Sequence, residues 1–221
     1  MTLHLGDTVP DFEANSTYGK IKFHDFIDGH WSILFSHPND FTPVCTTELG
    51  AVGAYLPEFE KRGVKVVALS CNDVESHQRW IEDIESFTPN AKISYPIIAD
   101  PTRELAIKFG MLDPDEKDAS GMPLTARAVF VVGPDKKLKL SILYPATTGR
   151  NFVEVLRVLD SLQLTAKYSV ATPVDWKNGD KCMVLPSLSN DAARAKFPKG
   201  FETFAVPSGK EYIRLTPQPN I

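Results

Sequence analysis

Residues 31–48 read Trp-Ser-Ile-Leu-Phe-Ser-His-Pro-Asn-Asp-Phe-Thr-Pro-Val-Cys-Thr-Thr-Glu. The apolar run at 33–35 contains β-branched and aromatic residues and is stopped by Pro38, which is typical of a buried strand that leads into a loop. A helix should follow at once. Thr42 is a favourable N-cap residue, and Pro43 suits the first helical position, where a missing N–H leaves no hydrogen bond unmade.

Cys45 is the candidate nucleophile of this stretch. It falls in the first turn of the predicted helix, where unpaired backbone N–H groups and the positive end of the helix dipole favour an anion. The thiolate should therefore be stabilised relative to the thiol, which is the setting that reactive cysteines need. The alternative is a buried cysteine packed as a small hydrophobe, the commoner role where no such context exists.

The composition predicts a globular protein and excludes several classes of function. The chain has 221 residues, of which 43% are hydrophobic, enough for one sizeable core and a small second domain. A net charge of -4 offers no basic field for nucleic acid. No segment approaches the roughly 18 to 20 apolar residues of a membrane span. The start of the chain lacks a secretory signal pattern, so we expect a cytoplasmic protein without stable membrane insertion.

The cysteines and histidines do not form a disulfide or metal pattern. Cys45, Cys71 and Cys182 are far apart and include no Cys-x-x-Cys, which argues against a disulfide framework and a thioredoxin-type dithiol. The five histidines show no paired metal-ligand spacing, so we predict no metal. For Cys71 and Cys182 an inert, packed role is favoured over that of a second reactive thiol.

The first half of the chain alternates between strand and helix patterns. The predicted strands cover residues 21–23, 31–36, 64–70 and 96–99. The predicted helices run from Pro43 to about Gly63, after a cap at Asp73, and from Arg103 to Phe109. Pro57 should kink the first helix or split it in two.

An antiparallel pattern follows. Strands at 126–132 and 138–144 flank the turn Gly-Pro-Asp-Lys-Lys, and a strongly periodic helix covers 152–162. A β-α-β unit followed by β-β-α around one sheet predicts an α/β, thioredoxin-like fold with a mixed central sheet flanked by helices. We expect this domain to cover residues 1–165.

From about residue 166 the chain changes character. Six of the 17 prolines lie in this part, and short strands are predicted at 181–185, 203–206 and 211–215. Strands this short can hardly bury a core alone. We therefore expect residues 166–221 to form a small C-terminal β-rich unit that docks on its own first domain or on a partner subunit.

The stretch 37–48 resembles the peroxidatic-cysteine motif of the peroxiredoxins. The core of that motif, Pro-x-x-x-Thr/Ser-x-x-Cys, is here Pro38, Thr42 and Cys45. Residues 110–114, 126–137, 144–151 and 171–180 are similar to the one-cysteine, peroxiredoxin-6-like subfamily. The resemblance implies an antioxidant peroxidase that reduces hydrogen peroxide and organic hydroperoxides, lipid hydroperoxides included, through a sulfenic acid at Cys45.

The resemblance also implies roles for the residues around Cys45. Thr42 would accept a hydrogen bond from the peroxide or bond to the thiolate, and Arg127 would keep Cys45 ionised and polarise the O–O bond. The alternative for Arg127 is a surface ion pair, but an arginine in an apolar strand usually needs a buried partner. Pro38 would shield the site from water, and Arg150 would support the charge network.

Two further residues have open alternatives. Glu48 lies one turn beyond Cys45 and either binds an arginine or faces solvent. His37 either lines the pocket or is a structural, hydrogen-bonded histidine.

The resemblance implies a one-cysteine cycle, because the Val-Cys-Pro motif of typical two-cysteine members is absent. An external thiol would then reduce the sulfenic acid, with glutathione as the usual reductant and a glutathione transferase as a candidate partner. No prosthetic cofactor is implied, and a homodimer is expected.

A phospholipase activity attributed to this subfamily is not supported by the sequence. Where the subfamily has Gly-Asp-Ser-Trp-Gly, residues 28–32 read Asp-Gly-His-Trp-Ser, so that His30 replaces the nucleophile. Ser32 is displaced by two residues, and His24 and Asp135 would have no serine to activate.

Two other functions compete with the peroxidase. The first is a redox-controlled binding protein or holdase chaperone with Cys45 as its sensor. The second is a thiol-disulfide oxidoreductase, against which the missing Cys-x-x-Cys argues.

Overall fold

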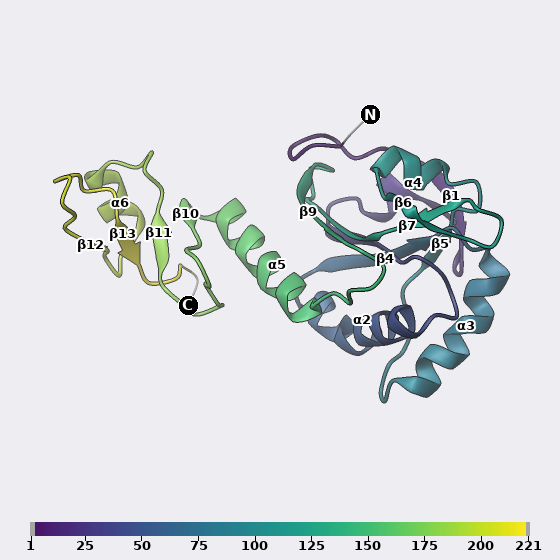
Figure 1. Cartoon of the computed structure of the whole chain (residues 1–221). Coiled ribbons are helices and arrows are strands. Elements are labelled where there is room, and N and C mark those ends of the chain that lie inside the picture. Colours follow the sequence, from purple (N-terminus) through teal and green to yellow (C-terminus); the bar gives the residue numbers. More distant parts are fainter. Residues whose placement is uncertain (1–2, 220–221) are drawn as a thin grey trace. The chain divides into compact units, whose positions relative to one another are not determined.

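The structure is a computed structural model that describes residues 3–219, and the chain divides into two compact units, residues 1–152 and 153–221 (Figure 1). Among the described residues, no helix is long and apolar enough to cross a membrane.

The first unit is built on a seven-stranded mixed sheet of order β2-β1-β5-β4-β3-β8-β9. At its centre, β3 (Trp31–Ser36) pairs in parallel with β4 (Val64–Ser70) and antiparallel with β8 (Arg127–Val132). The other strands are β1 (Glu13–Ser16), β2 (Gly19–Lys22), β5 (Ile97–Ala99) and β9 (Leu138–Tyr144). The central strands are mostly apolar because helices and loops cover both of their faces, and the polar Ser32 and Ser36 of β3 are buried too. The predicted mixed α/β architecture is confirmed.

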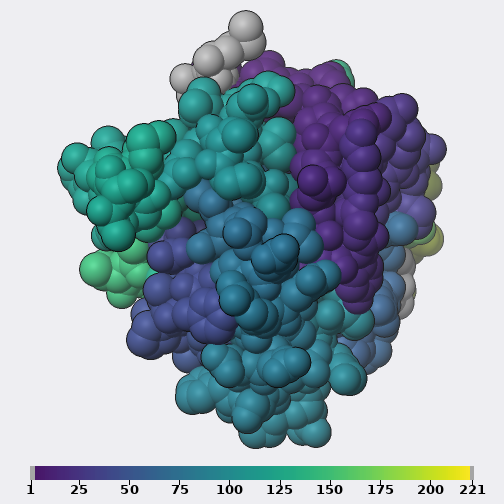
Figure 2. All heavy atoms as spheres, turned by 90° about the vertical axis from the view of Figure 1, so that its right-hand side faces the viewer, coloured from purple at the N-terminus to yellow at the C-terminus, as the bar shows by residue number. Residues whose placement is uncertain are grey.

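Helices cover this sheet, and the two longest of those in this unit begin at the residues expected from the sequence. They are α1 (Phe23–Phe26), α2 (Pro43–Lys61), α3 (Val74–Phe87) and α4 (Glu104–Phe109). Asp73 caps α3 by accepting the N–H of Ser76 at 2.7 Å. Gly110 ends α4 with a φ of +66°, a conformation that glycine adopts without strain. Helix α3 forms part of the outer face shown in Figure 2.

Two details of local structure differ from the predictions. The strand expected at 21–23 ends at Lys22, and Phe23 instead begins α1, where its buried ring stacks on Phe12 at 4.7 Å. Pro57 does not split α2, which stays continuous through that residue. One lost backbone hydrogen bond is offset there by the packing of a helix whose Leu49, Val52 and Phe59 are fully buried.

The two-stranded ribbon of β6 (Leu112–Lys117) and β7 (Pro123–Thr125) was not predicted. Its sequence is polar and carries no strong strand pattern. The polar strand β6 is defined by its pairing with β7, in which Leu124 and Thr125 are buried.

The second unit contains a four-stranded sheet of order β10-β11-β13-β12. Its elements are α5 (Phe152–Lys167), β10 (Val170–Ala171), β11 (Cys182–Val184), α6 (Asn190–Lys196), β12 (Glu202–Thr203) and β13 (Arg214–Thr216). Contrary to expectation, this unit has a small core of its own, formed around Trp176, Cys182 and Phe197. The last two strands overlap only in part with their predicted ranges, and α6, capped by Ser189, was missed. A role of this unit in dimerisation stays a prediction.

Candidate active site

The topology brings the end of β3 and the start of β8 together. Because the two strands are antiparallel, Arg127 at the start of β8 lies beside the loop that leaves β3. That loop, residues 37–42, leads directly into α2, and Cys45 occupies the first turn of this helix as predicted. The Cys45 side chain is 0% exposed.

Arg127 contacts Cys45 directly. Its Nη1 donates to Cys45 Sγ at 3.3 Å and to Glu48 Oε2 at 2.8 Å. Its Nε and Nη2 donate to the carbonyl of Ala146 at 2.9 and 2.6 Å, which fixes the plane of the guanidinium. Arg127 is buried, so the alternative of a surface ion pair does not apply. A permanent positive charge therefore lies in direct contact with the sulfur.

Glu48 joins Arg127 to Arg150. The Glu48 Oε1 accepts the N–H and Nε of Arg150 at 2.7 and 2.9 Å, and Oε2 accepts Arg150 Nη2 at 2.7 Å. Burial disfavours the Glu48 carboxylate, but the hydrogen bonds and charge of Arg150, with Arg127, outweigh it and hold the pKa of Glu48 below its usual range. Of the two alternatives for Glu48, binding to arginine is therefore the one observed.

Arg150 ties this network to the sheet. Its Nη1 donates to the carbonyls of Ser36 and Ala128 at 2.8 and 2.7 Å, and its guanidinium lies 5.3 Å from the ring of Phe35. Two guanidinium groups thus face one carboxylate and one sulfur. Charge is balanced when Cys45 is a thiolate, which makes the network suited to an anionic nucleophile.

Thr42 occupies the N-cap position, but it does not cap the helix as the sequence suggests. Its hydroxyl donates instead to the carbonyl of Asn39 at 2.8 Å. Because that bond uses the only hydroxyl proton, the oxygen of Thr42 is left as an acceptor. Pro38 is buried in the same loop.

His37 belongs to a buried polar cluster. Its Nε2 pairs with Asp40 Oδ1 at 2.8 Å, and His77 Nδ1 pairs with Asp40 Oδ2 at 2.7 Å. Burial lowers the pKa of His37. Burial also opposes the Asp40 carboxylate, but the hydrogen bonds from His37 and His77 hold the pKa of Asp40 well below its usual range. His37 Nδ1 is buried without a hydrogen-bond partner.

Sequence reasoning missed the roles of Asp40 and His77. In the sequence, Asp40 is visible only as an acidic residue inside the cysteine motif, and His77 only as a histidine in the first turn of α3, so nothing local indicates that they pair. His37, Asp40 and His77 could in principle hold a metal ion, because their ligand atoms lie within 4.8 Å of one another. In this structure those atoms are hydrogen-bonded within the cluster and to Ser76 and Ile98.

A groove of about 650 Å³ adjoins the start of α2. Thr42, Pro43 and Trp80 are among the residues that line it. Two exposed aromatic residues border it, Phe41 and Phe87, whose relative exposures are 52% and 64%.

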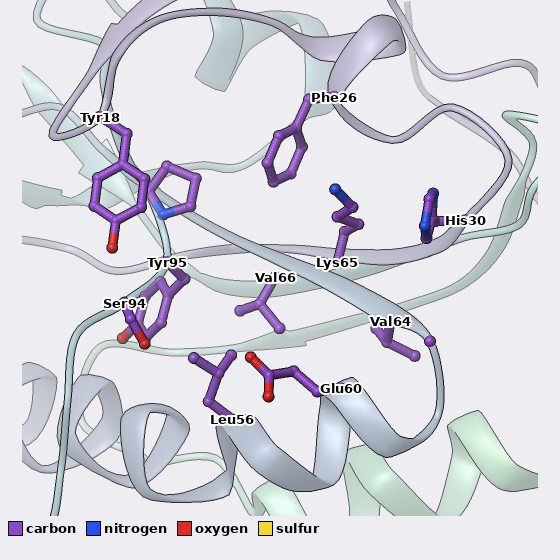
Figure 3. A pocket seen from close by; sticks show the side chains of 12 residues that line it. Tyr18, Phe26, His30, Leu56, Glu60, Val64, Lys65, Val66, Ser94 and Tyr95 are labelled. Carbon is purple, nitrogen blue, oxygen red and sulfur yellow. The ribbon is translucent and has the colours of Figure 1, made fainter.

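A second cavity of about 410 Å³ lies at the opposite ends of the strands (Figure 3). It opens beside Val64 at the start of β4 and is bordered by Lys65, Glu60 and the ring of Tyr18. Since Cys45 follows the end of the parallel strand β3, this cavity is separate from the cysteine site.

The remaining candidate nucleophiles lie in unfavourable settings. Cys71 and Cys182 are free and buried, and burial raises the pKa of Cys71 to about 11 and also raises that of Cys182. Ser32 is fully buried and its hydroxyl has no hydrogen-bond partner. His30 is exposed and contacts the carbonyl of Asp28. No serine-based hydrolytic site is formed by these residues.

The chain is similar to known proteins over nearly its whole length. The model of the AhpC/TSA family matches residues 5–141, and that of the C-terminal domain of 1-Cys peroxiredoxin matches residues 161–200. Over 220 residues the chain is 63% identical to peroxiredoxin-6 of Homo sapiens and of Gallus gallus, covering 98% of each chain.

Solved structures give the same result. A crystal structure of a C45S mutant of peroxiredoxin 6 from Arenicola marina matches with a TM-score of 0.96 and 60% identity, covering 99% of this chain and 100% of that one. A yeast mitochondrial 1-Cys peroxiredoxin, studied for thiol resolution through glutathione and thioredoxin systems, matches with a TM-score of 0.89 and 45% identity, covering 97% and 99%.

Proposed function

From the family to which the chain belongs, the AhpC/TSA family and within it the 1-Cys peroxiredoxins, it follows that the protein is a thiol-dependent peroxidase. We propose that Cys45 is its peroxidatic cysteine and that Thr42 and Arg127 act on the peroxide together with Cys45. One observation carries the proposal. Arg127 Nη1 donates to Cys45 Sγ at 3.3 Å inside a buried network that also contains Glu48 and Arg150.

The proposed step is an attack of the Cys45 thiolate on the terminal oxygen of the peroxide. A sulfur–oxygen bond forms and the O–O bond breaks, so that the terminal O–H group is transferred to Cys45 as a sulfenic acid. The leaving hydroxide or alkoxide takes up one proton from the solvent and departs as water or an alcohol. Thr42 accepts a hydrogen bond from the peroxide O–H, because its own proton is donated to Asn39. Arg127 stabilises the negative charge that moves onto the leaving oxygen.

The other residues at the site take supporting roles in this proposal. Glu48 and Arg150 hold the Arg127 guanidinium in place. Pro38 excludes water from the sulfur. His37 is part of the wall of the site, since its ring is buried against Trp80 at 5.0 Å and is paired with Asp40.

We assign the return step to an external thiol, in line with the thiol reductants that 1-Cys peroxiredoxins use. The first thiol displaces water from the sulfenic acid and forms a mixed disulfide, and a second thiol releases Cys45 as a thiol. Glutathione is the proposed reductant, with a glutathione transferase as the proposed partner. The yeast relative, resolved by glutathione and thioredoxin systems, supports this choice.

Organic hydroperoxides are proposed substrates beside hydrogen peroxide. The groove lined by Thr42, Phe41 and Phe87 supports this, because it offers apolar surface at the start of the helix that carries Cys45. A homodimer and a cytoplasmic location are proposed on the family resemblance alone.

The test is rapid-mixing consumption of hydrogen peroxide and cumene hydroperoxide by the wild type, by Cys45→Ser and by a Cys71→Ser/Cys182→Ser double variant. The proposal predicts a fast reaction in the wild type and the double variant and none in Cys45→Ser. If all three proteins react slowly and alike, Cys45 is not activated and the proposal fails.

A further inference from the structure

The segment 37–42, which we call the cysteine loop, is clamped by Asn72, a residue just beyond the end of β4. The Asn72 Nδ2 donates to Asn39 Oδ1 at 2.6 Å, and the Asn72 Oδ1 accepts the backbone N–H of Asp40 at 3.0 Å. Ser70 fixes Asn72 in turn, since its hydroxyl donates to Asn72 Oδ1 at 3.0 Å and accepts the Asn72 N–H at 3.2 Å. Asn72 is therefore held with its amide aimed at two consecutive residues of the loop.

Helix α3 supplies a second clamp on the same loop. The Asp40 Oδ2 accepts the hydroxyl of Ser76 at 2.7 Å and pairs with His77 Nδ1 at 2.7 Å. Asp40 and His77 are both buried. Buried, charge-assisted hydrogen bonds of this length are strong and directional, so they fix where the loop lies relative to α3.

The loop needs such restraint because its backbone is strained. Phe41 has a φ of +54°, a left-handed conformation that a bulky residue rarely adopts. Strain of this kind persists only where the surroundings impose it. Phe41 stands between the clamped residues 39 and 40 and the start of α2, so the clamps stabilise the turn that leads to Thr42.

The clamp reaches the reacting groups through one further bond. The carbonyl of Asn39 accepts the hydroxyl of Thr42 at 2.8 Å, so the position of Asn39 decides where the lone pairs of the Thr42 oxygen point. The charge on Cys45 depends on other residues, namely Arg127 and its partners Glu48 and Arg150. Orientation of the peroxide and ionisation of the sulfur thus rest on separate contacts.

We propose that Asn72 is a positioning residue for the peroxidase reaction, which acts through Asn39 on the Thr42 hydroxyl, with Ser76 and His77 supporting it through Asp40. This inference rests on the proposed roles of Cys45 and Thr42. It separates two functions of the site: Asn72 orients the acceptor for the peroxide without setting the reactivity of the thiolate.

The test compares two reactions of Cys45 in the variant Asn72→Ala. The first is the second-order reaction with hydrogen peroxide, and the second is alkylation by iodoacetamide, followed at Cys45 by peptide mass analysis. Alkylation needs the thiolate but not the Thr42 acceptor. We expect the peroxide rate to fall by about tenfold or more, as for a lost orienting hydrogen bond, and the alkylation rate to stay within about twofold of the wild type.

Two further variants serve as controls. Asn15→Ala removes an exposed asparagine from β1 and should change neither rate. Ser76→Ala removes one donor to Asp40 with little disturbance of α3, and should show the same selective loss at smaller size. It keeps the inference testable if Asn72→Ala does not fold.

A double-mutant cycle with Thr42→Val completes the test. If Asn72 acts through Thr42, its removal should add little to the loss already caused by Thr42→Val. Three results would overturn the inference. They are full additivity of the losses caused by Asn72→Ala and Thr42→Val, a peroxide rate of Asn72→Ala within about twofold of the wild type, and an equal fall of its peroxide and alkylation rates. A fast peroxide reaction of Cys45→Ser would instead overturn the proposed function on which the inference rests.

Discussion

Replacing Glu48 by glutamine tests how much the charge of this buried carboxylate contributes to the stability of the protein. The carboxylate accepts from Arg150 on one oxygen and from both Arg127 and Arg150 on the other. Glutamine has the same shape but only one acceptor oxygen, so in either orientation two of these bonds are lost and an NH₂ group faces N–H donors.

The magnitude follows from those two bonds. Hydrogen bonds to charged groups contribute about 1.5–3 kcal/mol each, and breaking a buried ion pair on one side typically costs about 3–5 kcal/mol. We therefore expect Glu48→Gln to lower the free energy of unfolding of the first unit by about 3–5 kcal/mol at pH 7. Urea unfolding measures this without the screening that a salt denaturant would add. The matched control is Glu82→Gln on the exposed face of α3, which should stay within about 0.5 kcal/mol of the wild type.

The difference should also depend on pH with a definite sign. The pKa of Glu48 is lowered in the folded protein, so its contribution is fully present above the pKa of an unfolded glutamate, about 4.3, and is lost as the pH falls through the folded value. The gap between wild type and Glu48→Gln should thus be constant above about pH 6 and shrink in acid. A gap below about 1 kcal/mol at pH 7, or one that does not shrink in acid, would refute the electrostatic account of this network.

Three other predictions concern the same unit. Arg127→Gln should slow the peroxide reaction by about 10²–10³-fold in rapid-mixing experiments, because it removes the positive charge that acts on Cys45 and the leaving oxygen; a loss smaller than about threefold would contradict this role. Gly50→Ala should destabilise the protein by about 1–3 kcal/mol in urea unfolding, since a Cβ there would lie 2.1 Å from Thr88 Oγ1; stability equal to that of the wild type would show that this packing is loose. Cys71 should resist iodoacetamide at pH 8 in the native protein, because its pKa is raised to about 11; labelling of Cys71 as fast as that of Cys45 would show that its burial does not protect it.

The parts of the site that could be predicted from the sequence are those set by local signals. The strand at 31–36 and the helix start at Pro43 follow from the apolar run and the N-terminal proline, and they place Cys45 in the first turn. Arg127 stood out because a charged residue in an apolar strand needs a buried partner. Its contact with Cys45 nevertheless depends on antiparallel pairing between β3 and β8, which the sequence implies only through the fold.

The unpredicted parts depend on contacts between distant segments. Glu48 binds an arginine rather than facing solvent because the segment after β9 brings Arg150 to it. Arg150 lies 102 residues after Glu48 in the chain. Asp40 meets His77 only because α3 packs beside the cysteine loop, 37 residues away. The hydroxyl of Thr42 bonds to Asn39 rather than capping α2, since the strained turn at Phe41 brings that carbonyl within reach. Local patterns do not specify such packing choices.

The central claim is that Cys45 alone carries the oxidising equivalent of the peroxide. The most direct measurement is mass analysis of the wild type after one equivalent of hydrogen peroxide in the absence of added thiol, with the modified residue located by peptide mapping. The account predicts one added oxygen atom per chain, placed on Cys45 and trapped by dimedone as a sulfenic acid. A disulfide between Cys45 and Cys71 or Cys182 as the main product, or oxidation at another residue, would contradict it.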